Sequence, residues 1–316
     1  MKNIQPEHKV LVAYHAHCID GFTSAWACWR GLIETTSVRS SNIELMPVTY
    51  GKELDSILNR ASEFYKIYFV DFSVRPDILD SLTEHSKVAV IDHHKSAVEM
   101  YADFLDTTPE AMCVGYHMVE DAEVTMDLGE CGASLVWKYF YGNTIKMPPL
   151  IGYVKDYDLW KFLLADTKAI NKYLRLQEKS TSRWNELDDM FKDSWELETL
   201  VNEGHAMLNY HDSIVADLVL QAEPVTIAGQ KGMVVNCSPQ FSSDVGHLLA
   251  KVSRTFGATW QQEPEGVVKW SLRSQGDYDV SLIANIFGGG GHKNAAGFTL
   301  NSPDYDHKKG ITLWAE

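Results

Sequence analysis

Residues 87–96 read KVAVIDHHKS, an apolar run of strand length that ends in one aspartate and two histidines. Similar apolar runs alternate with amphipathic helical stretches over the first 96 residues. This alternation predicts βαβ units and a parallel sheet. In such sheets, ligands bind beyond the carboxyl ends of the strands. Asp92, His93 and His94 therefore stand where a functional site is expected.

The elements around this strand follow the same pattern. Two earlier strands are predicted at 10–14 (VLVAY) and 66–70 (KIYFV). Pro76 falls in the first turn of the next predicted helix, where the missing N–H of proline costs nothing. Helices are predicted over residues 20–32, 52–65, 75–86, 132–140 and 148–162, and most of 166–220 is predicted to be helical and rather polar.

The sequence changes character from Glu223 onward. Strands are predicted at 224–229, 232–237, 258–263 and 267–274, with helices at 243–256 and 279–287. We therefore predict an α/β chain of two domains with a boundary near residues 215–222. Its parts are a parallel-sheet domain with flanking helices over 1–185, a helical connector over 186–220 and a smaller α+β domain over 221–316.

The charge of the chain is unevenly distributed. The 316 residues carry a net charge of −15, and residues 1–220 hold 20 Lys+Arg against 34 Asp+Glu. Residues 221–316 hold 8 against 9 and are nearly neutral. Proteins that bind long duplexes neutralise many phosphates with basic side chains, so this composition argues against such a role. A short phosphorylated substrate held by metal ions is compatible with it.

Composition also bears on location. No segment approaches the roughly 18 consecutive apolar residues of a membrane helix, and the first 18 residues do not resemble a signal peptide. The five cysteines are scattered and include no CxxC pair, which is typical of reduced thiols. We expect a cytoplasmic protein without a membrane partner. The sequence leaves a homodimer open.

Three predicted strands end in side chains that ligate metals. They stop directly before His15, Asp71 and Asp92. A single aspartate or histidine in this position is usually a helix cap or a packed side chain, but three coincidences favour a metal site. Imidazoles together with carboxylates suit manganese, iron or zinc better than calcium. Two neighbouring ions would share a carboxylate, for which Asp71 is the best placed candidate.

Five motifs, in order along residues 10–300, resemble those of the DHH phosphoesterase superfamily. They are DGFTSAW (20–26), VDFS (70–73), VIDHHKS (90–96), VKDYDLWKF (154–162) and FGGGGHKNAAGF (287–298). The last resembles the glycine-rich motif of the DHH-associated substrate-binding domain. The resemblance implies a DHH metal-binding catalytic domain, followed by a domain that delivers the substrate phosphate.

The resemblance also implies roles for individual residues. His94 is implied as the active-site histidine that contacts the scissile phosphate or the leaving group. Asp92 is implied as the carboxylate that orients an imidazole. Asp158, two residues after Asp156, is expected to cap a helix or to form an ion pair. The implied metal ligands are His15, Asp20, Asp71, His93 and Asp156, and they would hold two divalent ions, with manganese preferred.

The first motif departs from the common pattern of the family. Two residues before Asp20, where an aspartate is usual, the chain has Cys18, and His17 stands beside it. A thiolate or an imidazole could replace the missing carboxylate. A third alternative is that one ion has fewer protein ligands. The sequence alone does not choose among the three.

The glycine-rich motif predicts an anion site in the second domain. Four consecutive glycines, including Gly290 and Gly291, permit a concave array of N–H groups. By resemblance, His292 and this backbone bind a phosphate or a nucleotide. Arg273, just upstream, is the expected partner, because its planar guanidinium matches a phosphate bidentately.

Together these features predict a metal-dependent phosphodiesterase that cleaves short oligoribonucleotides or linear dinucleotides to mononucleotides. The alternatives are a cyclic-dinucleotide or nucleoside 3′,5′-bisphosphate phosphatase, a pyrophosphatase or polyphosphatase, and a non-catalytic nucleotide-sensing module. The acidic first domain disfavours processive cleavage of long strands, which needs a basic channel with stacking aromatic side chains. Residues 287–298 contain only one lysine, Lys293, which disfavours a pyrophosphatase.

Overall fold

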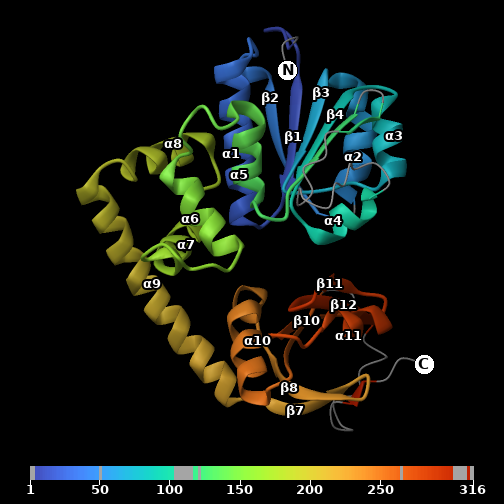
Figure 1. Cartoon of the computed structure of the whole chain (residues 1–316), viewed down its shortest axis with the longest axis vertical. Helices are drawn as coiled ribbons and strands as arrows, with labels where there is room; N and C mark the ends of the chain where they lie inside the picture. The colour runs from blue at the N-terminus through green and yellow to red at the C-terminus, as the bar shows by residue number, and fades with distance from the viewer. Residues whose placement is uncertain are drawn as a thin grey trace. The chain divides into compact units, whose positions relative to one another are not determined.

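The computed structural model describes residues 4–49, 52–102, 117–119, 122–263, 266–301 and 312–313. The chain divides into two compact units, Met1–Met207 and Leu208–Glu316. Figure 1 shows a sheet with helices in each of them. The division falls inside the long helix α9 (Ser194–Leu220), N-terminal to the boundary that the sequence predicts.

The first unit is built on a six-stranded sheet with the strand order β2-β1-β3-β4-β6-β5. All neighbouring strands run parallel except β5, which pairs antiparallel with β6. The strands that the sequence predicts are therefore adjacent at the centre of the sheet. Their bounds are β1 (Val10–His15), β2 (Ile43–Val48), β3 (Lys66–Val70), β4 (Lys87–Asp92), β5 (His117–Val119) and β6 (Ala122–Met126).

Helices cover both faces of this sheet (Figure 1). Successive side chains of a strand point to opposite faces, so each central strand contributes side chains to two hydrophobic cores. On β1, Val10 and Val12 enter the core shared with α1, α5, α6, α7 and α8, whereas Leu11 and Ala13 enter the core shared with α2, α3 and α4. The bounds are α1 (Ile19–Thr35), α2 (Lys52–Arg60), α3 (Pro76–Thr83), α4 (Lys95–Met100), α5 (Gly132–Tyr141), α6 (Pro149–Asp158), α7 (Thr167–Arg175) and α8 (Thr181–Met190).

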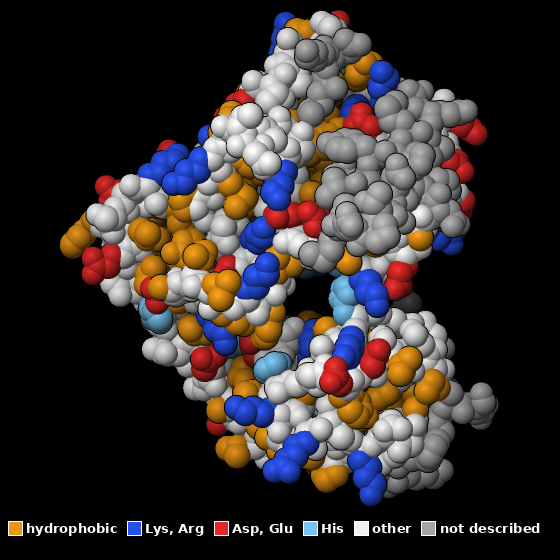
Figure 2. Space-filling model, in the orientation of Figure 1, with side chains coloured by type: hydrophobic (Ala, Val, Ile, Leu, Met, Phe, Trp, Pro, Cys, Tyr) orange, Lys and Arg blue, Asp and Glu red, His pale blue; other side chains and the backbone are white. Residues whose placement is uncertain are grey.

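The region from α6 to α9 includes residues 166–220, which the sequence predicts to be mostly helical and rather polar. It also exposes apolar side chains, which gather on the left of the space-filling view in Figure 2. Leu163, Leu176 and Trp195 are 81%, 69% and 76% exposed. None of the helices in the described ranges combines the length and the apolar character needed to cross a membrane.

The second unit contains a seven-stranded sheet with the order β11-β12-β10-β9-β8-β7-β13. Strands β8 and β9 are parallel and are joined by helix α10 (Pro239–Ser253), while β13 runs parallel to β7. The remaining pairs are antiparallel. The bounds are β7 (Glu223–Ile227), β8 (Gln230–Asn236), β9 (Phe256–Gln262), β10 (Val267–Ser274), α11 (Ser281–Ile286), β11 (Gly290–His292), β12 (Ala295–Asn301) and β13 (Thr312–Leu313).

The second unit has cores of its own. Val245 and Leu249 of α10 pack with Val215 of α9 and Val235 of β8, while Ile283 of α11 belongs to a separate cluster with residues of the sheet. The predicted fold class, a parallel-sheet α/β unit joined to a smaller α+β unit, is confirmed.

Candidate metal centre

The first unit gathers ligand-type side chains at one edge of its sheet. Strand β1 ends at His15, Asp71 follows β3, and β4 ends at Asp92 with His93 and His94 directly after it. Strands β1, β3 and β4 are parallel neighbours, so their carboxyl ends lie side by side. The structure thus brings together residues that are up to 79 positions apart in the sequence.

Asp71 lies at the centre of this group. Its Oδ1 is 3.1 Å from His93 Nε2, and its Oδ2 is 3.6 Å from His15 Nδ1. The side chain is buried, and within the described residues nothing donates a hydrogen bond to Oδ2. Burial alone would raise the pKa of Asp71, but His15 and His93 hold that pKa below its ordinary value. A buried carboxylate oxygen without a donor fits a bound cation.

The N-terminus of α5 holds a second buried carboxylate. The backbone N–H groups of Gly132 and Ala133 donate to Asp20 Oδ2 and Oδ1, at 2.6 and 3.0 Å. A helix N-terminus favours a negative group, so Asp20 is held in its place. A Cβ on Gly132 would lie 2.6 Å from the Cβ of Asp71, so only glycine lets α5 approach this closely. Gly132 is a residue of the site that the sequence analysis did not identify.

Three carboxylates surround the imidazole of His93. Its Nε2 lies 3.7 Å from Asp20 Oδ2 and 3.5 Å from Asp158 Oδ2, besides its contact with Asp71. Burial raises the pKa of Asp20 well above its ordinary value, and the charges of Asp71 and Asp158 add to the effect. Burial also raises the pKa of Asp158 to about 6, against the lowering effect of His93. The carboxylates therefore repel one another, and divalent cations would relieve this repulsion.

Asp92 positions a histidine. Its Oδ1 lies 2.7 Å from His94 Nδ1 and accepts the backbone N–H of His93 at 2.7 Å, while Oδ2 accepts the hydroxyl of Ser73 at 2.6 Å. A carboxylate on one imidazole nitrogen fixes the orientation of the ring. The imidazole that Asp92 orients is that of His94.

Three groups of ligand-type side chains occur in the described ranges, and within each group the ligand atoms lie within 4.8 Å of one another. Asp71 belongs to two groups and His93 to two. A shared carboxylate is what two neighbouring metal ions require, so the donor set fits divalent cations. The groups are Asp71, Asp92, His93 and His94; His15, Cys18 and Asp71; and Asp20, His93 and Asp158.

Asp156, which was predicted as a metal ligand, belongs to none of the three groups. Its oxygens accept the backbone N–H groups of Leu163 and Leu164 and the hydroxyl of Thr167. Asp156 therefore fastens the segment between α6 and α7. Asp158, the last residue of α6, faces His93 instead. Residues two apart on a helix point in different directions, so only one of the two could reach the cluster.

The structure also separates the two candidates in the first motif. Cys18 lies with His15 and Asp71, whereas His17 is exposed and belongs to none of the three groups. Burial raises the pKa of the Cys18 thiol well above its ordinary value, and the nearby charge of Asp71 adds to this. Without a cation the sulfur is therefore a neutral thiol. A metal ion beside it would favour the thiolate.

In the second unit, the predicted anion-binding residues lie on the two strands that flank β12. Arg273 of β10 and His292 of β11 both pair with Ala295 of β12, so they flank one position of that strand. Gly290 and Gly291 belong to the same short strand β11. Gly291 has a φ of 137°, at which any residue with a side chain would be strained. The structure thus assembles this set within one sheet.

Arg273 is held by neighbours in its own unit. Its Nη1 donates to Ser271 Oγ and to the carbonyl of Leu272, and its Nη2 donates to Ser243 Oγ of α10, each at 2.9 Å. Burial lowers the pKa of Arg273, and the charge of Asp244 partly opposes this. All three acceptors are uncharged, so a phosphate can still be attracted.

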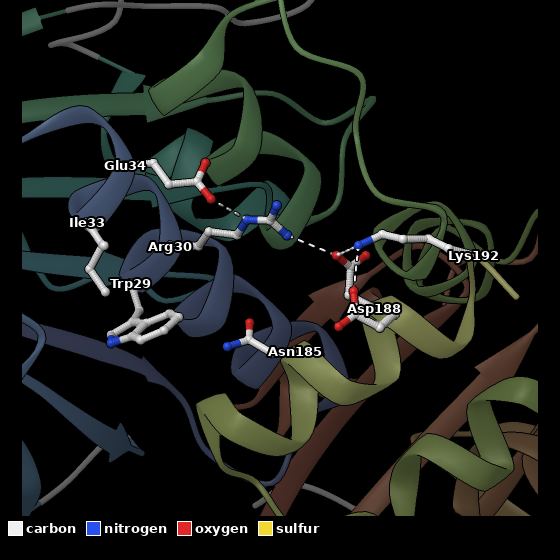
Figure 3. Close-up of a pocket in the computed structure, with 8 residues that line it drawn as sticks. Trp29, Arg30, Ile33, Glu34, Asn185, Asp188 and Lys192 are labelled. Carbon is white, nitrogen blue, oxygen red and sulfur yellow. Dashed lines mark hydrogen bonds and ion pairs between the residues drawn. The ribbon is translucent and has the colours of Figure 1, made fainter.

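A pocket of about 370 Å³ between α1 and α8 lies outside the cluster (Figure 3). Its cations are paired with its acids. Arg30 contacts Glu34 at 2.8 Å and Asp188 at 2.9 Å, and Lys192 also contacts Asp188 at 2.9 Å. These contacts tie α8 to α1, so the pocket carries no unpaired cation for an anion.

Comparison with known proteins agrees with this geometry. A sequence profile described as the DHHA1 domain matches residues 238–309, which include Arg273 and the glycine-rich motif. Together with the cluster around the Asp-His-His sequence, this match supports a DHH-family phosphoesterase.

Curated relatives of this DHH protein are distant. An uncharacterized protein of Acanthamoeba polyphaga mimivirus is 26% identical over 308 residues, covering 92% of this chain and 67% of the relative. Oligoribonuclease NrnB of Bacillus subtilis is 24% identical, covering 76% and 60%. The cyclic-di-AMP phosphodiesterase PdeA of Listeria monocytogenes is 22% identical, covering 82% and 40%. The DHH chain thus spans only about 40–67% of the length of these relatives.

Solved structures share the fold of this DHH chain. The DHH domain of a protein from a family of ribosomal proteins superposes with a TM-score of 0.61 at 14% identity, covering 92% of this chain and 82% of that one. RecJ of Thermus thermophilus in complex with Mn²⁺ superposes with a TM-score of 0.51 at 16% identity, covering 94% and 50%. At these identities the likeness concerns the fold alone.

Proposed function

We propose that this protein is a metal-dependent phosphodiesterase that hydrolyses short oligoribonucleotides or linear dinucleotides to mononucleotides in the cytoplasm. The observation that carries this proposal is the position of Asp71, whose buried carboxylate belongs to two of the three ligand groups. In this proposal Asp71 would be a ligand of both ions. Bound there, the ions would supply Lewis acidity toward a phosphoryl group and a nucleophilic water.

The residues that would hold the ions are His15, Asp20, Asp71, His93 and Asp158, with Cys18 beside His15. Manganese is the preferred metal, because a mixed set of imidazoles and carboxylates suits it. The RecJ structure named above also carries Mn²⁺. Asp158 enters this set in place of Asp156 because it lies 3.5 Å from His93.

In this proposal His94 contacts the phosphate. Burial would lower the pKa of its imidazole, but the hydrogen bond and the charge of Asp92 raise that pKa to about 9. In the metal-free protein His94 is therefore protonated at neutral pH, with Nδ1 held by Asp92. A positive imidazole can stabilise the negative charge on the phosphoryl oxygens or give its proton to the leaving oxygen.

The substrate class rests on charge and on the relatives. Residues 1–220 carry a net charge of −14, which disfavours long strands, and Arg273 with His292 offers a compact anion site. NrnB is named an oligoribonuclease and PdeA a cyclic-di-AMP phosphodiesterase. Cleavage of linear dinucleotides is our first expectation, and cyclic dinucleotides are the nearest alternative.

The test is product chromatography after incubation of the purified protein with Mn²⁺. The substrates are linear dinucleotides, cyclic dinucleotides, a nucleoside 3′,5′-bisphosphate, a longer single strand and pyrophosphate. Asp71→Asn serves as the inactive variant. Asp77→Asn is the matched control, because Asp77 is an exposed aspartate that pairs only with Arg75 in the described ranges.

We expect mononucleotides from linear dinucleotides, lost with a chelator and in Asp71→Asn but retained in Asp77→Asn. Turnover of pyrophosphate alone would support metal-dependent hydrolysis but contradict the proposed substrate class. Binding of dinucleotides without turnover, with every metal tried, would contradict the enzymatic proposal and favour a sensing module.

A further inference from the structure

The metal cluster opens onto a pocket that the proposed chemistry does not use. One cavity of about 290 Å³ is lined by His15, Asp20, Asp158 and Arg175, so it borders the cluster directly. A second cavity of about 410 Å³ shares Arg175 and the loop 17–19 with the first. The two cavities therefore adjoin through a common wall. Their sizes are within or near the roughly 300–1,000 Å³ of small-molecule sites.

The second cavity has an apolar wall and a basic wall. Tyr14, Phe22 and Pro47 line the apolar side, and Arg175 and Lys179 line the other. Aromatic and apolar side chains with a few polar groups are the usual lining of a nucleoside site. The lining thus combines surface for a base with charge for a phosphate.

Arg175 is a cation that lines both cavities. It is the last residue of α7, it is exposed, and within the described part of the chain its guanidinium forms no hydrogen bond or ion pair. It stands beside an acidic cluster in an acidic unit, where most other arginines are paired with carboxylates. Arg30, for example, contacts both Glu34 and Asp188. An unpaired guanidinium in this position is available to a bound anion.

Lys179 is a second basic residue that lines the same cavity as Arg175. Its ammonium donates to the carbonyls of Leu174, Arg175 and Gln177 and lies 4.9 Å from the centre of the Trp184 ring. No carboxylate pairs with it in the described ranges. Burial lowers the pKa of Lys179 to about 8, and the neighbouring charge of Arg175 adds to this. Two neighbouring cations without an acid repel each other, and an anion between them and the cluster would relieve the repulsion.

We infer that Arg175 binds a phosphate of the substrate and that the cavity lined by Tyr14, Phe22 and Pro47 receives the adjoining nucleoside. Arg175 is thus a substrate-binding residue, and Lys179 is a positioning residue that holds the end of α7. This inference rests on the proposed function, because it assigns a nucleotide subsite to the same metal centre. Such a subsite would bind a nucleotide in preference to a phosphate group without a base.

The test is equilibrium binding, measured by calorimetry on the full chain after chelator treatment. The probes are a nucleoside monophosphate, the same nucleoside without its phosphate, and inorganic phosphate. The variants are Arg175→Gln and Arg175→Lys. Lys192→Gln is the matched control, because it removes one positive charge from the same unit at the pocket of Figure 3.

We expect Arg175→Gln to weaken binding of the monophosphate about 10- to 100-fold, the range of one charge-assisted contact. Arg175→Lys should recover part of this loss, and Lys192→Gln should bind like the unchanged protein. The nucleoside without phosphate should bind equally to all variants. Equal affinity of Arg175→Gln and the unchanged protein for the monophosphate would overturn the inference, as would inorganic phosphate binding as tightly as the nucleotide.

A second measurement separates this inference from the proposed function. With Mn²⁺ and a linear dinucleotide, Arg175→Gln should raise KM and leave kcat nearly unchanged. If the unchanged protein hydrolyses none of the substrates while Arg175→Gln still loses nucleotide binding, the proposed function fails and the subsite stands. If hydrolysis occurs with the same KM in both proteins, the subsite fails and the proposed function stands.

Discussion

The strand-end cluster of the first unit and the glycine-rich strand of the second unit hold their polar groups in different ways. In the cluster, Asp20 and Asp71 are both buried; burial raises the pKa of Asp20, whereas His15 and His93 hold the pKa of Asp71 below its ordinary value. On β11, His292 is exposed, and the hydrogen-bond acceptors of Arg273 on β10 are neutral within the residues that the structure describes. Cations would balance the charge of the cluster, whereas in the second unit Arg273 is the predicted partner of an anion. Substitutions should therefore be far more costly in the cluster.

The largest effect is expected for Asp71→Asn. The amide would take the place of a carboxylate that belongs to two ligand groups, so both metal positions lose a charged ligand. We expect kcat/KM to fall by more than the roughly 10- to 100-fold that outer partners of a metal site contribute. Steady-state kinetics on a linear dinucleotide measures this loss. If Arg273→Gln costs as much as Asp71→Asn, the contrast between the two regions breaks down.

The pair Asp158→Asn and Asp156→Asn sharpens the outline of the cluster. Asp158→Asn should weaken Mn²⁺ binding by at least about tenfold, because a carboxylate near His93 is lost. Asp156→Asn should leave the affinity unchanged. It should lower the free energy of unfolding by about 1–3 kcal/mol, because three donors lose a charged acceptor. Calorimetry and urea denaturation measure the two effects, and the reverse assignment would restore Asp156 as the ligand.

Metal binding should depend on pH. Burial would lower the pKa of His93, but its hydrogen bond to Asp71 and the charge of Asp158 raise it to about 10. Metal ligation needs the neutral imidazole, so an ion must displace this proton. For one displaced proton, Mn²⁺ affinity should rise about tenfold per pH unit between pH 6 and 8. Titrations in buffers of different protonation enthalpy count the protons released, and an affinity independent of pH would contradict the geometry around His93.

The same protonation makes a prediction for the metal-free protein. A histidine whose pKa is raised in the fold binds its proton more tightly there than in the unfolded chain. The native state then holds more protons between about pH 6.5 and pH 10, so the stabilisation is complete below pH 6.5 and is lost as pH rises through this window. Thermal unfolding of the chelated protein at pH 6.5 and pH 9 measures it, and a higher midpoint at pH 9 would exclude this linkage.

The smallest effect is expected in the second unit. Arg273→Gln should raise KM for a linear dinucleotide by about tenfold, the contribution of one charged hydrogen-bonded contact, and leave kcat nearly unchanged. Its bonds to Ser243 and Ser271 can be kept in part by the amide. Arg254→Gln is the matched control, because it makes the same substitution in the same unit at the C-cap of α10. A fall in kcat at constant KM would place Arg273 in the chemical step.

Much of the first unit could be predicted from the sequence, because functional side chains of parallel sheets lie at the carboxyl ends of the strands. His15, Asp71 and Asp92 were identified from strand runs alone, and the structure sets them on adjacent strands. Strand β2 was missed because it is a half-exposed edge strand that contains Pro47, which weakens the strand pattern. The family assignment from five motifs is confirmed.

Other features of the site depend on tertiary packing. The N–H group of Gly132 donates to Asp20, which is 112 positions away in the sequence, and no local sequence pattern predicts such a contact. The choice between Asp156 and Asp158 depends on how α6 is rotated against the sheet, which helix periodicity alone does not fix. Arg175 carries no motif at all. The roles of Arg273, Gly290, Gly291 and His292 stay predictions.

The central claim is that Asp71 joins two metal positions in a hydrolytic site. Its most direct test is the number of manganese ions per chain, measured by elemental analysis after equilibration of the chelated protein with Mn²⁺, together with dinucleotide hydrolysis in the same samples. We predict two ions per chain and hydrolysis in the unchanged protein, and fewer ions without hydrolysis in Asp71→Asn. Hydrolysis that persists in fully metal-free protein, or an unchanged ion count in Asp71→Asn, would contradict the claim.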